Sequence, residues 1–394
     1  MNFSVVMPTY NRSYQLMLTL AAFETQTCPF DQFEIIVMND GSTDDTIAQL
    51  QRFQARAPYR LTAISASETT GRSTARNVGA AAAAGNYIIF CDPDYLVSPD
   101  FIKVHADYHR KFRNAVVSGV PGLFRNAYTH VHSDYSDAEK AAMAEVLKRA
   151  GLWQEHYWHT RETIPIITPE DVRSRNGKLE QVLAPWDAHS PVYRQFRTTD
   201  VAPWLLAVTR SLSMPKHIFK RVGGFDERFQ KHGLEDWELG YRLHRRGYKF
   251  ISMKEFIGYH QDHPAAFRNV DTESENLRLI YHQHGFRNPE LTLFAVCPPS
   301  EGLPEYKNTL RILRKWRRSK HATDRLAARR AARAFRRSAI LFYKNPNSVV
   351  YRRSKANLKR AVLSSYRLNR LRPSKRRHRK IRKLMNRACR RASR

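Results

Sequence analysis

Short apolar runs alternate with helical segments over the first 110 residues, and this alternation constrains the fold more than any other feature. The runs are apolar throughout, which is typical of strands that are buried on both faces of a parallel sheet. Strands are expected over residues 3–7, 33–38, 61–64 and 87–90. Helices are expected over about 13–26, from about residue 44, over 75–84 and over about 99–110. The sequence therefore predicts an α/β fold with a mostly parallel sheet flanked by helices.

Polar side chains follow these strands at the points where the strands end. Pro8-Thr9-Tyr10 follows the first run, Asp40 the second and Asp92-Pro93-Asp94 the fourth. Ligands of such sheets bind at the carboxyl ends of the strands. Two neighbouring carboxylates repel each other unless they share a cation, and Mg²⁺ and Mn²⁺ prefer oxygen ligands. From the residues alone, a divalent-metal site and an ordinary proline turn before a helix both remain open.

Residues 125–200 break this rhythm. Ser136 and Glu139 form a capping-box pattern for a helix that should end near residue 150, and the segment GLWQEHYWHT follows. Several aromatic side chains in this region suit either core packing or stacking on a sugar. They are Trp153, His156, Tyr157, Trp158 and Trp186. Farther along the chain we expect strands over 203–208 and 248–252 and an amphipathic helix over 235–245.

The positive charge of the chain is concentrated at its C-terminal end. Residues 301–394 hold 33 Lys and Arg against three acidic residues, so this segment carries +30 of the net +31. Apolar residues recur among the arginines as in two or three basic amphipathic helices. Such a segment suits an anionic membrane surface, nucleic acid or an acidic polymer. Nucleic acid is the least favoured of these partners because no nucleic-acid-binding motif accompanies the charge.

The cysteines and the N-terminus bear on the compartment. Cys28, Cys91, Cys297 and Cys389 are scattered without CxxC spacing, which indicates neither a disulfide framework nor a zinc site. The chain begins with the strand-like FSVVM, so no signal peptide is expected. No run approaches the roughly 20 apolar residues of a membrane span. These features predict a cytoplasmic protein.

Four segments resemble glycosyltransferase family 2, a large group with the Rossmann-like GT-A fold. They are VVMPTYNRSYQL (5–16), EIIVMNDGSTDDT (34–46), GRSTARNVGAAAAAGNYIIFCDPD (71–94) and GGFDERFQKHGLEDWELGYRL (223–243). Their order and spacing match the family, and the last is similar to the galactosyltransferase-type C-terminal segment of bacterial polysaccharide-building enzymes. The resemblance implies four parts. They are a nucleotide-sugar-binding half (1–125), an aromatic-rich insert (126–200), an acceptor-binding and catalytic half (201–300) and a basic helical tail (301–394).

The resemblance also implies a donor site for a UDP-sugar. Pro8-Thr9-Tyr10 resembles the loop that lines the nucleoside, and Asp40 resembles the acid that hydrogen-bonds the base. Arg72 matches a basic residue near the base and phosphates. Asp92 resembles the acid that contacts the ribose or donor sugar, and Asp94 the ligand of a Mn²⁺ or Mg²⁺ that meets the diphosphate. Independently of the family, Asp40 suits a cap on its own turn, and Arg72 suits a solvated charge at a helix end.

The catalytic end follows from the same resemblance. Glu235-Asp236 matches the ED motif, in which Asp236 is the general base that removes the acceptor hydroxyl's proton. Glu235 would orient the acceptor or a neighbouring group. Without the resemblance, Asp236 is also typical of the first turn of a helix. His260 resembles a late histidine that completes the metal site in several GT-A enzymes, and His263 is a second candidate.

These residues together predict a metal-dependent, inverting transferase. It would move a hexose or N-acetylhexosamine from a UDP-sugar to a saccharide or lipid-linked glycan in cell-surface polysaccharide synthesis. It would act as a peripheral protein at the inner face of the cell membrane. Trp204 and Trp237 are expected to contact the acceptor. The alternative is a catalytically inactive transferase-like protein whose basic tail binds nucleic acid or an acidic polymer; the presence of every acid that the reaction needs disfavours it.

Overall fold

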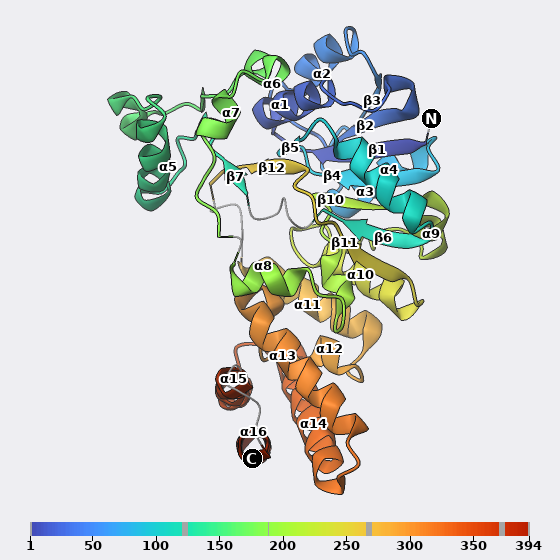
Figure 1. The fold of residues 1–394 in the computed structure, drawn as a ribbon, viewed down its shortest axis with the longest axis vertical. Helices are drawn as coiled ribbons and strands as arrows, with labels where there is room; N and C mark the ends of the chain where they lie inside the picture. The colour runs from blue at the N-terminus through green and yellow to red at the C-terminus, as the bar shows by residue number, and fades with distance from the viewer. Residues whose placement is uncertain (1, 120–124, 188, 265–269, 370–374, 393–394) are drawn as a thin grey trace. The chain divides into compact units, whose positions relative to one another are not determined.

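The computed structural model describes residues 2–119, 125–187, 189–264, 270–369 and 375–392. The contacts within the chain define two units. The sheet unit consists of Met1–Ala188 and Trp204–Glu273, and the helical unit consists of His189–Pro203 and Ser274–Arg394. Figure 1 shows the labelled strands and helices of both units. Each unit thus combines two separate stretches of the chain.

A seven-stranded, mostly parallel sheet forms the centre of the sheet unit, which confirms the predicted fold class. Its strand order is β11-β6-β10-β4-β1-β2-β3. The strands are β1 (Phe3–Thr9), β2 (Phe33–Asn39), β3 (Arg60–Ser65), β4 (Tyr87–Cys91), β6 (Ala115–Ser118), β10 (Ser211–Pro215) and β11 (Lys249–Ser252). Only β10 is antiparallel to its neighbours in this sheet. The carboxyl ends of β1, β2 and β4 therefore meet at one edge of the sheet.

Helices cover both faces of this sheet. They include α1 (Ser13–Phe23), α2 (Thr46–Gln54), α3 (Arg72–Ala82), α4 (Phe101–Lys111), α9 (Lys216–Arg221) and α10 (Glu235–Arg245). Val5 and Met7 of β1 belong to the core cluster that also contains Leu16 of α1. Val6 points to the opposite face because side chains alternate along a strand. There α3 approaches so closely that a Cβ on Gly79 would lie 2.6 Å from a Val6 methyl carbon.

Two smaller sheets complete the sheet unit. One has the order β5-β12-β7, and the other pairs β8 with β9. Their strands are β5 (Tyr95–Val97), β7 (Asn126–Ala127), β8 (His130–Val131), β9 (Ile164–Pro165) and β12 (Gly258–Gln261). The insert adds α5 (Asp137–Arg149), the 3-10 helix η3 (Glu155–His159), α6 (Pro169–Ser174) and α7 (Lys178–Gln181). The Ser136 capping box at the start of α5 is confirmed.

The strand expected over residues 203–208 is wrong. This stretch contains the 3-10 helix η4 (Pro203–Leu206), and the strand of this region, β10, begins at Ser211. Ala202 has a φ of 43°, a left-handed conformation that interrupts an extended chain before Pro203. Trp204, Leu205 and Leu206 are all buried. A short apolar run that is buried all round does not distinguish a strand from a helical turn.

The basic C-terminal segment folds into long helices, which confirms the predicted helical extension. The helical unit contains α8 (Pro191–Phe196), part of α11 (Val270–His284), α12 (Pro289–Thr292), α13 (Pro299–Arg318), α14 (Ala322–Lys344), α15 (Val349–Asn369) and α16 (Lys375–Ala392). Many of their apolar side chains are buried, among them Trp316, Phe335, Leu358 and Met385, whereas Leu326, Val349 and Val350 are exposed. None of the described helices is long and apolar enough to cross a membrane.

A buried lysine ties α13 to the segment that carries α8. Lys307 is fully buried, and its Nζ donates to the carbonyl oxygens of Gln195 (2.9 Å) and Thr198 (2.7 Å). Burial, with a smaller contribution from Arg311, lowers the pKa of Lys307 to about 7. The ammonium group is thus costly to bury, and its hydrogen bonds offset that cost.

We expect Lys307→Met to lower the free energy of unfolding by about 2–4 kcal/mol. The methionine fills the space but leaves the two carbonyl oxygens without their donor. Lys315→Met, at an exposed position of the same helix, is the matched control and should change stability by less than about 0.5 kcal/mol. Urea denaturation followed by circular dichroism measures both, and equal stabilities for the two variants would contradict the assignment.

Candidate active site

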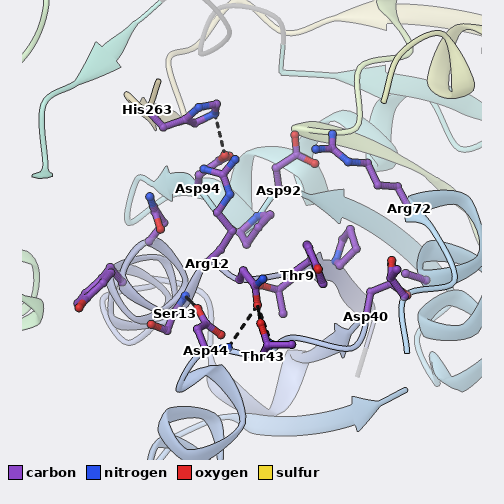
Figure 2. A pocket seen from close by; sticks show the side chains of 18 of the residues that line it. Thr9, Arg12, Ser13, Asp40, Thr43, Asp44, Arg72, Asp92, Asp94 and His263 are labelled. Carbon is purple, nitrogen blue, oxygen red and sulfur yellow. Dashed lines mark hydrogen bonds and ion pairs between the residues drawn. The ribbon is translucent and has the colours of Figure 1, made fainter. Parts of the chain in front are cut away.

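The residues predicted to bind the donor line one cleft at the carboxyl edge of the main sheet. The cleft has a volume of about 760 Å³, which is within the range of small-molecule sites. Figure 2 shows it from close by, with Asp94 facing His263 and with Asp40 and Arg72 in the same view. The predicted donor residues that line it are Pro8, Thr9, Tyr10, Asp40, Arg72, Asp92 and Asp94. The structure thus brings all seven together.

Hydrogen bonds between two loops pre-organise one wall of the cleft. Asn11 has a φ of 49°, a left-handed conformation that asparagine tolerates better than most residues. Its backbone N–H donates to Ser42 Oγ (2.9 Å), and its Oδ1 accepts the N–H groups of Thr43 (2.7 Å) and Asp44 (3.3 Å). These bonds tie the loop after β1 to the loop after β2. Tyr10, next to Asn11, remains 48 % exposed at the cleft.

Asp40 holds a loop that lies 30 residues farther along the chain. Its two carboxylate oxygens accept four hydrogen bonds: from Thr69 Oγ1 (3.0 Å), from Thr70 N and Oγ1 (2.7 Å each) and from Gly71 N (3.0 Å). The expected cap on its own turn is wrong, because Asn39 Oδ1 accepts the Ser42 N–H instead. A carboxylate has about four acceptor positions. Direct binding of a base by Asp40 stays a prediction, and it requires one of these bonds to open.

Three side chains meet in a candidate metal site. Asp94 follows β4, and His260 lies on β12, which pairs with β5 directly after Asp94. Asp94 Oδ2 is 3.8 Å from His260 Nε2 and 3.5 Å from His263 Nε2. One potential ligand atom from each residue lies within 4.8 Å of the others. His260 Nδ1 is 3.3 Å from Asn126 Oδ1, and this contact orients the ring so that Nε2 faces Asp94.

The ionised carboxylate of Asp94 makes this candidate metal site suitable for a cation. Burial alone raises the pKa of Asp94, but His260, His263 and Arg12 outweigh it and hold this pKa well below its ordinary value. The carboxylate is therefore ionised and ready to act as a ligand. One carboxylate and two imidazoles fit a divalent metal ion. Of the two metals expected from the sequence, Mn²⁺ fits better, because Mg²⁺ takes oxygen ligands almost exclusively.

A second group of carboxyls lies where α10 begins. Glu235 is buried and accepts hydrogen bonds from Arg76 Nη1 (3.1 Å) and from the Gly233 N–H (2.9 Å). Arg76 Nη2 also reaches Asp92 Oδ1 at 3.3 Å. Asp236 Oδ1 accepts the Trp237 N–H at 2.7 Å, and no other hydrogen bond or ion pair reaches this carboxyl in the described parts of the chain. The ED motif is thus joined to the donor residue Asp92 through one arginine.

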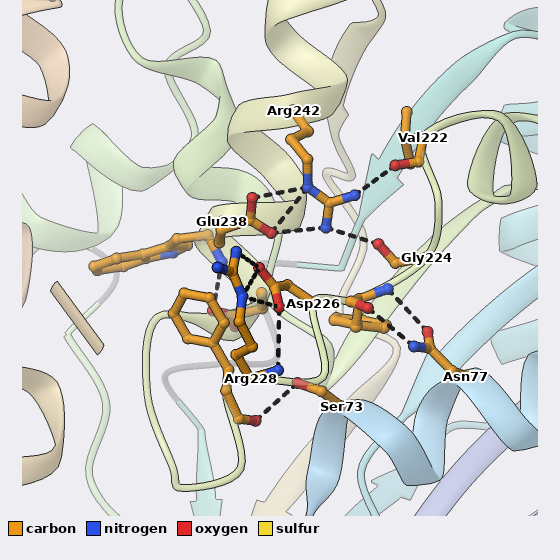
Figure 3. Close-up of polar contacts among 12 residues, drawn as sticks. Ser73, Asn77, Val222, Gly224, Asp226, Arg228, Glu238 and Arg242 are labelled. Carbon is orange, nitrogen blue, oxygen red and sulfur yellow. Dashed lines mark hydrogen bonds and ion pairs between the residues drawn. The ribbon is translucent and has the colours of Figure 1, made fainter. Parts of the chain in front are cut away.

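The loop before α10 is fixed by a dense set of polar contacts, shown in Figure 3. Arg242 binds Glu238 through two nitrogens and donates to the carbonyl oxygens of Val222 and Gly224. Asn77 of α3 donates to Phe225 O and accepts the Phe225 N–H. These bonds hold the GGFDE loop between α3 and α10, so the position of Glu235-Asp236 relative to the sheet is fixed.

Two family profiles match this chain. Residues 4–163 match the profile described as "Glycosyl transferase family 2", and residues 189–288 match that of "Glycosyltransferase like family 2". The chain belongs to glycosyltransferase family 2. The family resemblance drawn from the four sequence segments is confirmed, and the mostly parallel sheet with flanking helices is the GT-A fold of that family.

Several curated relatives align with about 70% of the chain. The uncharacterized glycosyltransferase YfnE of Bacillus subtilis (strain 168) is 27% identical over 292 residues, 70% of this chain and 69% of that protein. Validoxylamine A glucosyltransferase of Streptomyces hygroscopicus subsp. jinggangensis (strain 5008) is 30% identical over 73% of this chain and 62% of its own length. Chondroitin synthase of Escherichia coli is 27% identical over 68% and 36%. The chain therefore spans less than two thirds of the last two.

Solved structures give a weaker likeness. The crystal structure of Staphylococcus aureus TarS 1-349 in complex with UDP-GlcNAc has a TM-score of 0.49 and 16% identity, covering 94% of this chain and 92% of that one. The mannosyltransferase PcManGT from Pyrobaculum calidifontis, in complex with GDP-Man and Mn²⁺, has a TM-score of 0.44 and 16% identity, covering 100% and 86%.

The two tryptophans expected at the acceptor lie differently in this family 2 chain. Trp204 has no exposed surface and packs against Tyr241 with the ring centroids 5.5 Å apart. A side chain with no exposed face offers no surface to a sugar, so Trp204 belongs to the core under α10. Trp237 is partly exposed, and its Nε1 donates to Leu205 O at 3.1 Å. Trp237 remains the candidate for the acceptor.

The aromatic residues of the insert pack mainly against one another. Trp153 makes edge contacts with Tyr157 (5.5 Å between ring centroids) and with Trp158 (5.3 Å). Trp186 packs edge-on against Phe256 at 4.6 Å. These contacts favour the packing interpretation over sugar stacking.

Sequence reasoning missed some residues of the site. Arg76 is not marked by the sequence, because an arginine in an alanine-rich helix is equally typical of an exposed position, as Arg329 and Arg333 of α14 show. His263 was only a second candidate, and Arg12 was not singled out. The insert also supplies lining residues that no local pattern marks. They are His132, Ser133, Asp134 and Thr163.

Proposed function

We propose that this family 2 protein is an inverting glycosyltransferase that moves a hexose or N-acetylhexosamine from a UDP-sugar to a saccharide or lipid-linked glycan. The observation that carries the proposal is that three features lie in the sheet unit: the cleft lined by the donor residues, the Asp94–His260–His263 group, and Arg76 with its two carboxylates. The relatives named as a glucosyltransferase and as chondroitin synthase support a sugar donor and a saccharide acceptor.

The donor side of the cleft would bind the nucleotide sugar. Tyr10 and the backbone of Pro8 and Thr9 would line the nucleoside, and Arg72 would face the phosphates. Asp94, His260 and His263 would hold Mn²⁺. When bound there, the metal would offset the charge that develops on the leaving diphosphate.

The transfer itself would be a single displacement with Asp236 as the base. The acceptor hydroxyl oxygen attacks C1 of the sugar, and the bond from C1 to the diphosphate oxygen breaks. UDP leaves with that electron pair, and the hydroxyl proton passes to the Asp236 carboxylate. Burial, together with the neighbouring Glu235 carboxylate, raises the pKa of Asp236 to about 8. A base with a raised pKa binds the proton more strongly, and it is increasingly ionised as the pH rises through about 8.

Release of UDP from a panel of UDP-sugars tests the proposal. Each donor is incubated with Mn²⁺, with Mg²⁺ or with EDTA, and UDP is measured with and without saccharide acceptors. We expect one donor to be turned over with Mn²⁺ and none with EDTA. Absence of UDP-sugar binding and turnover under every condition would refute the proposed function and would favour the inactive, polyanion-binding alternative.

We further propose that the helical unit holds the enzyme on an anionic membrane surface at the cytoplasmic face. Most apolar side chains of these helices are buried, with Leu326, Val349 and Val350 exposed, so the attraction would be mainly electrostatic. Exposed arginines along α14 supply the charge, among them Arg329, Arg333 and Arg336.

Changing these three arginines to glutamine should weaken binding to phosphatidylglycerol vesicles about 100-fold, because each basic residue contributes about 1 kcal/mol. The triple change of the same arginines to lysine is the control and should bind like wild type. Co-sedimentation at low and high salt measures the binding. Equal binding to neutral vesicles, or tighter binding to RNA than to anionic vesicles, would count against the membrane proposal.

A further inference from the structure

One arginine interacts with three carboxyl groups in this site. Arg76 lies on α3, and its side chain is only 2 % exposed. Nη1 donates to Glu235 Oε1 at 3.1 Å and Nη2 donates to Asp92 Oδ1 at 3.3 Å. Asp236 also acts on Arg76 electrostatically. The guanidinium group therefore joins a donor-side carboxylate to the two carboxyls at the start of α10.

The charges of this cluster do not balance. Glu235 and Asp236 are adjacent, and the repulsion between two neighbouring carboxylates is relieved when one of them keeps its proton. The hydrogen bonds indicate which one. Glu235 has the Arg76 nitrogen and the Gly233 N–H, and Asp92 has the second Arg76 nitrogen. Asp236 has only the N–H of Trp237 among the described residues.

The neighbouring charges also favour an ionised Glu235 and a protonated Asp236. Burial alone raises the pKa of Glu235, but Arg76, followed by Arg72 and His232, lowers it overall. The pKa of Asp236 is raised by burial, by Glu235 and by Asp92, and Arg76 and the Trp237 N–H offset part of that rise. Removal of Arg76 should therefore raise the pKa of Asp236 further.

We propose that Arg76 is a positioning residue that binds Asp92 and Glu235 through separate nitrogens and so leaves Asp236 as the carboxyl that exchanges the acceptor's proton. The inference rests on the proposed function, which it deepens. The planar fork of arginine is essential, since a lysine carries the same charge but concentrates it at one point and cannot hold both carboxylates in this geometry. Arg76 Nε is buried and has no hydrogen-bond partner among the described residues. This unfavourable burial accompanies the position in which the two Nη atoms reach both carboxylates.

Profiles of kcat/KM against pH for wild type, Arg76→Gln and Arg76→Lys test the inference. We expect a wild-type rate that rises through about pH 8. In Arg76→Gln the rate at pH 7 should fall about 100-fold, and the rising limb should move up by at least about one pH unit, so that part of the activity returns in more alkaline buffer. Arg76→Lys should keep the limb near its wild-type position but lose about tenfold in rate at every pH. Arg52→Gln, an exposed arginine of α2, is the matched control and should leave the profile unchanged.

A readout independent of turnover separates this inference from the proposed function. The carboxyl carbon of Asp236, labelled with ¹³C and assigned by its loss in Asp236→Asn, reports the protonation of this group directly as the pH changes. We expect its midpoint to move upward in Arg76→Gln. In Arg76→Gln, an unchanged midpoint, or a uniform loss of rate with no movement of the pH profile, would overturn the role of Arg76. If Arg76→Gln does not fold, Arg76→Lys decides the question, because a wild-type rate in this variant at every pH would show that the two-nitrogen fork is not needed. Absence of transfer in wild type would instead refute the function, while the carboxyl titration would still test Arg76.

Discussion

Asp236→Asn is expected to lower the rate of sugar transfer by about 10³-fold and to leave UDP-sugar binding within about threefold of wild type. An amide has almost the shape of the carboxyl but accepts no proton at neutral pH, and removal of a general base typically costs 10² to 10⁴ in rate. Binding is spared because Asp236 does not line the donor cleft, whereas Asp92 and Asp94 do. Transfer is measured as acceptor glycosylation, and binding is measured by calorimetry with the donor.

A matched change elsewhere controls for this substitution. Asp107→Asn removes an exposed carboxylate on α4 that pairs with Arg110, and it should leave transfer and binding unaltered. Glu235→Gln distinguishes the roles of the two acids of the motif. The Glu235 carboxylate already accepts hydrogen bonds from Arg76 and from the Gly233 N–H, so it is less available to accept a proton from the acceptor. A rate for Asp236→Asn within tenfold of wild type would remove Asp236 as the base.

The elements that position the donor site could be read from local sequence patterns. The apolar runs at 3–7, 33–38 and 87–90 became β1, β2 and β4 because strands buried on both faces are apolar throughout. Since the carboxyl ends of parallel strands meet at one edge, the positions of Tyr10, Asp40 and Asp94 in one cleft followed from the strand prediction.

Contacts between distant segments could not be read in this way. The carboxylate of Asp40 binds Thr69, Thr70 and Gly71 because the chain returns there after β3, and nothing in its own turn indicates this. The burial of Trp204 depends on the packing of η4 beneath α10. The basic helices resembled amphipathic membrane helices because the pattern shows that a helix has an apolar face, but not which partner covers it.

The candidate metal site of Asp94, His260 and His263 depends both on a local sequence pattern and on contacts between distant segments. The spacing of Asp92 and Asp94 indicated either a metal site or a turn, and the family resemblance then singled out Asp94 and placed His260 before His263. The structure places both imidazoles beside Asp94, with His263 Nε2 the nearer at 3.5 Å against 3.8 Å for His260 Nε2. β12 makes this possible, since its pairing with β5 brings a strand from residue 258 onward beside the DxD turn.

Asp94→Asn should therefore weaken Mn²⁺ binding by at least about 100-fold and lower donor turnover by about 10³-fold. The substitution removes the single anionic ligand of the group and leaves two imidazoles, which bring no negative charge to offset a divalent cation. Electron paramagnetic resonance of Mn²⁺ with the free protein measures the binding without any turnover. His263→Ala, which keeps the carboxylate, should lose less affinity, and Asp107→Asn should lose none. Wild-type Mn²⁺ affinity in Asp94→Asn would place the metal elsewhere, whereas lost affinity with undiminished turnover would show that the reaction proceeds without it.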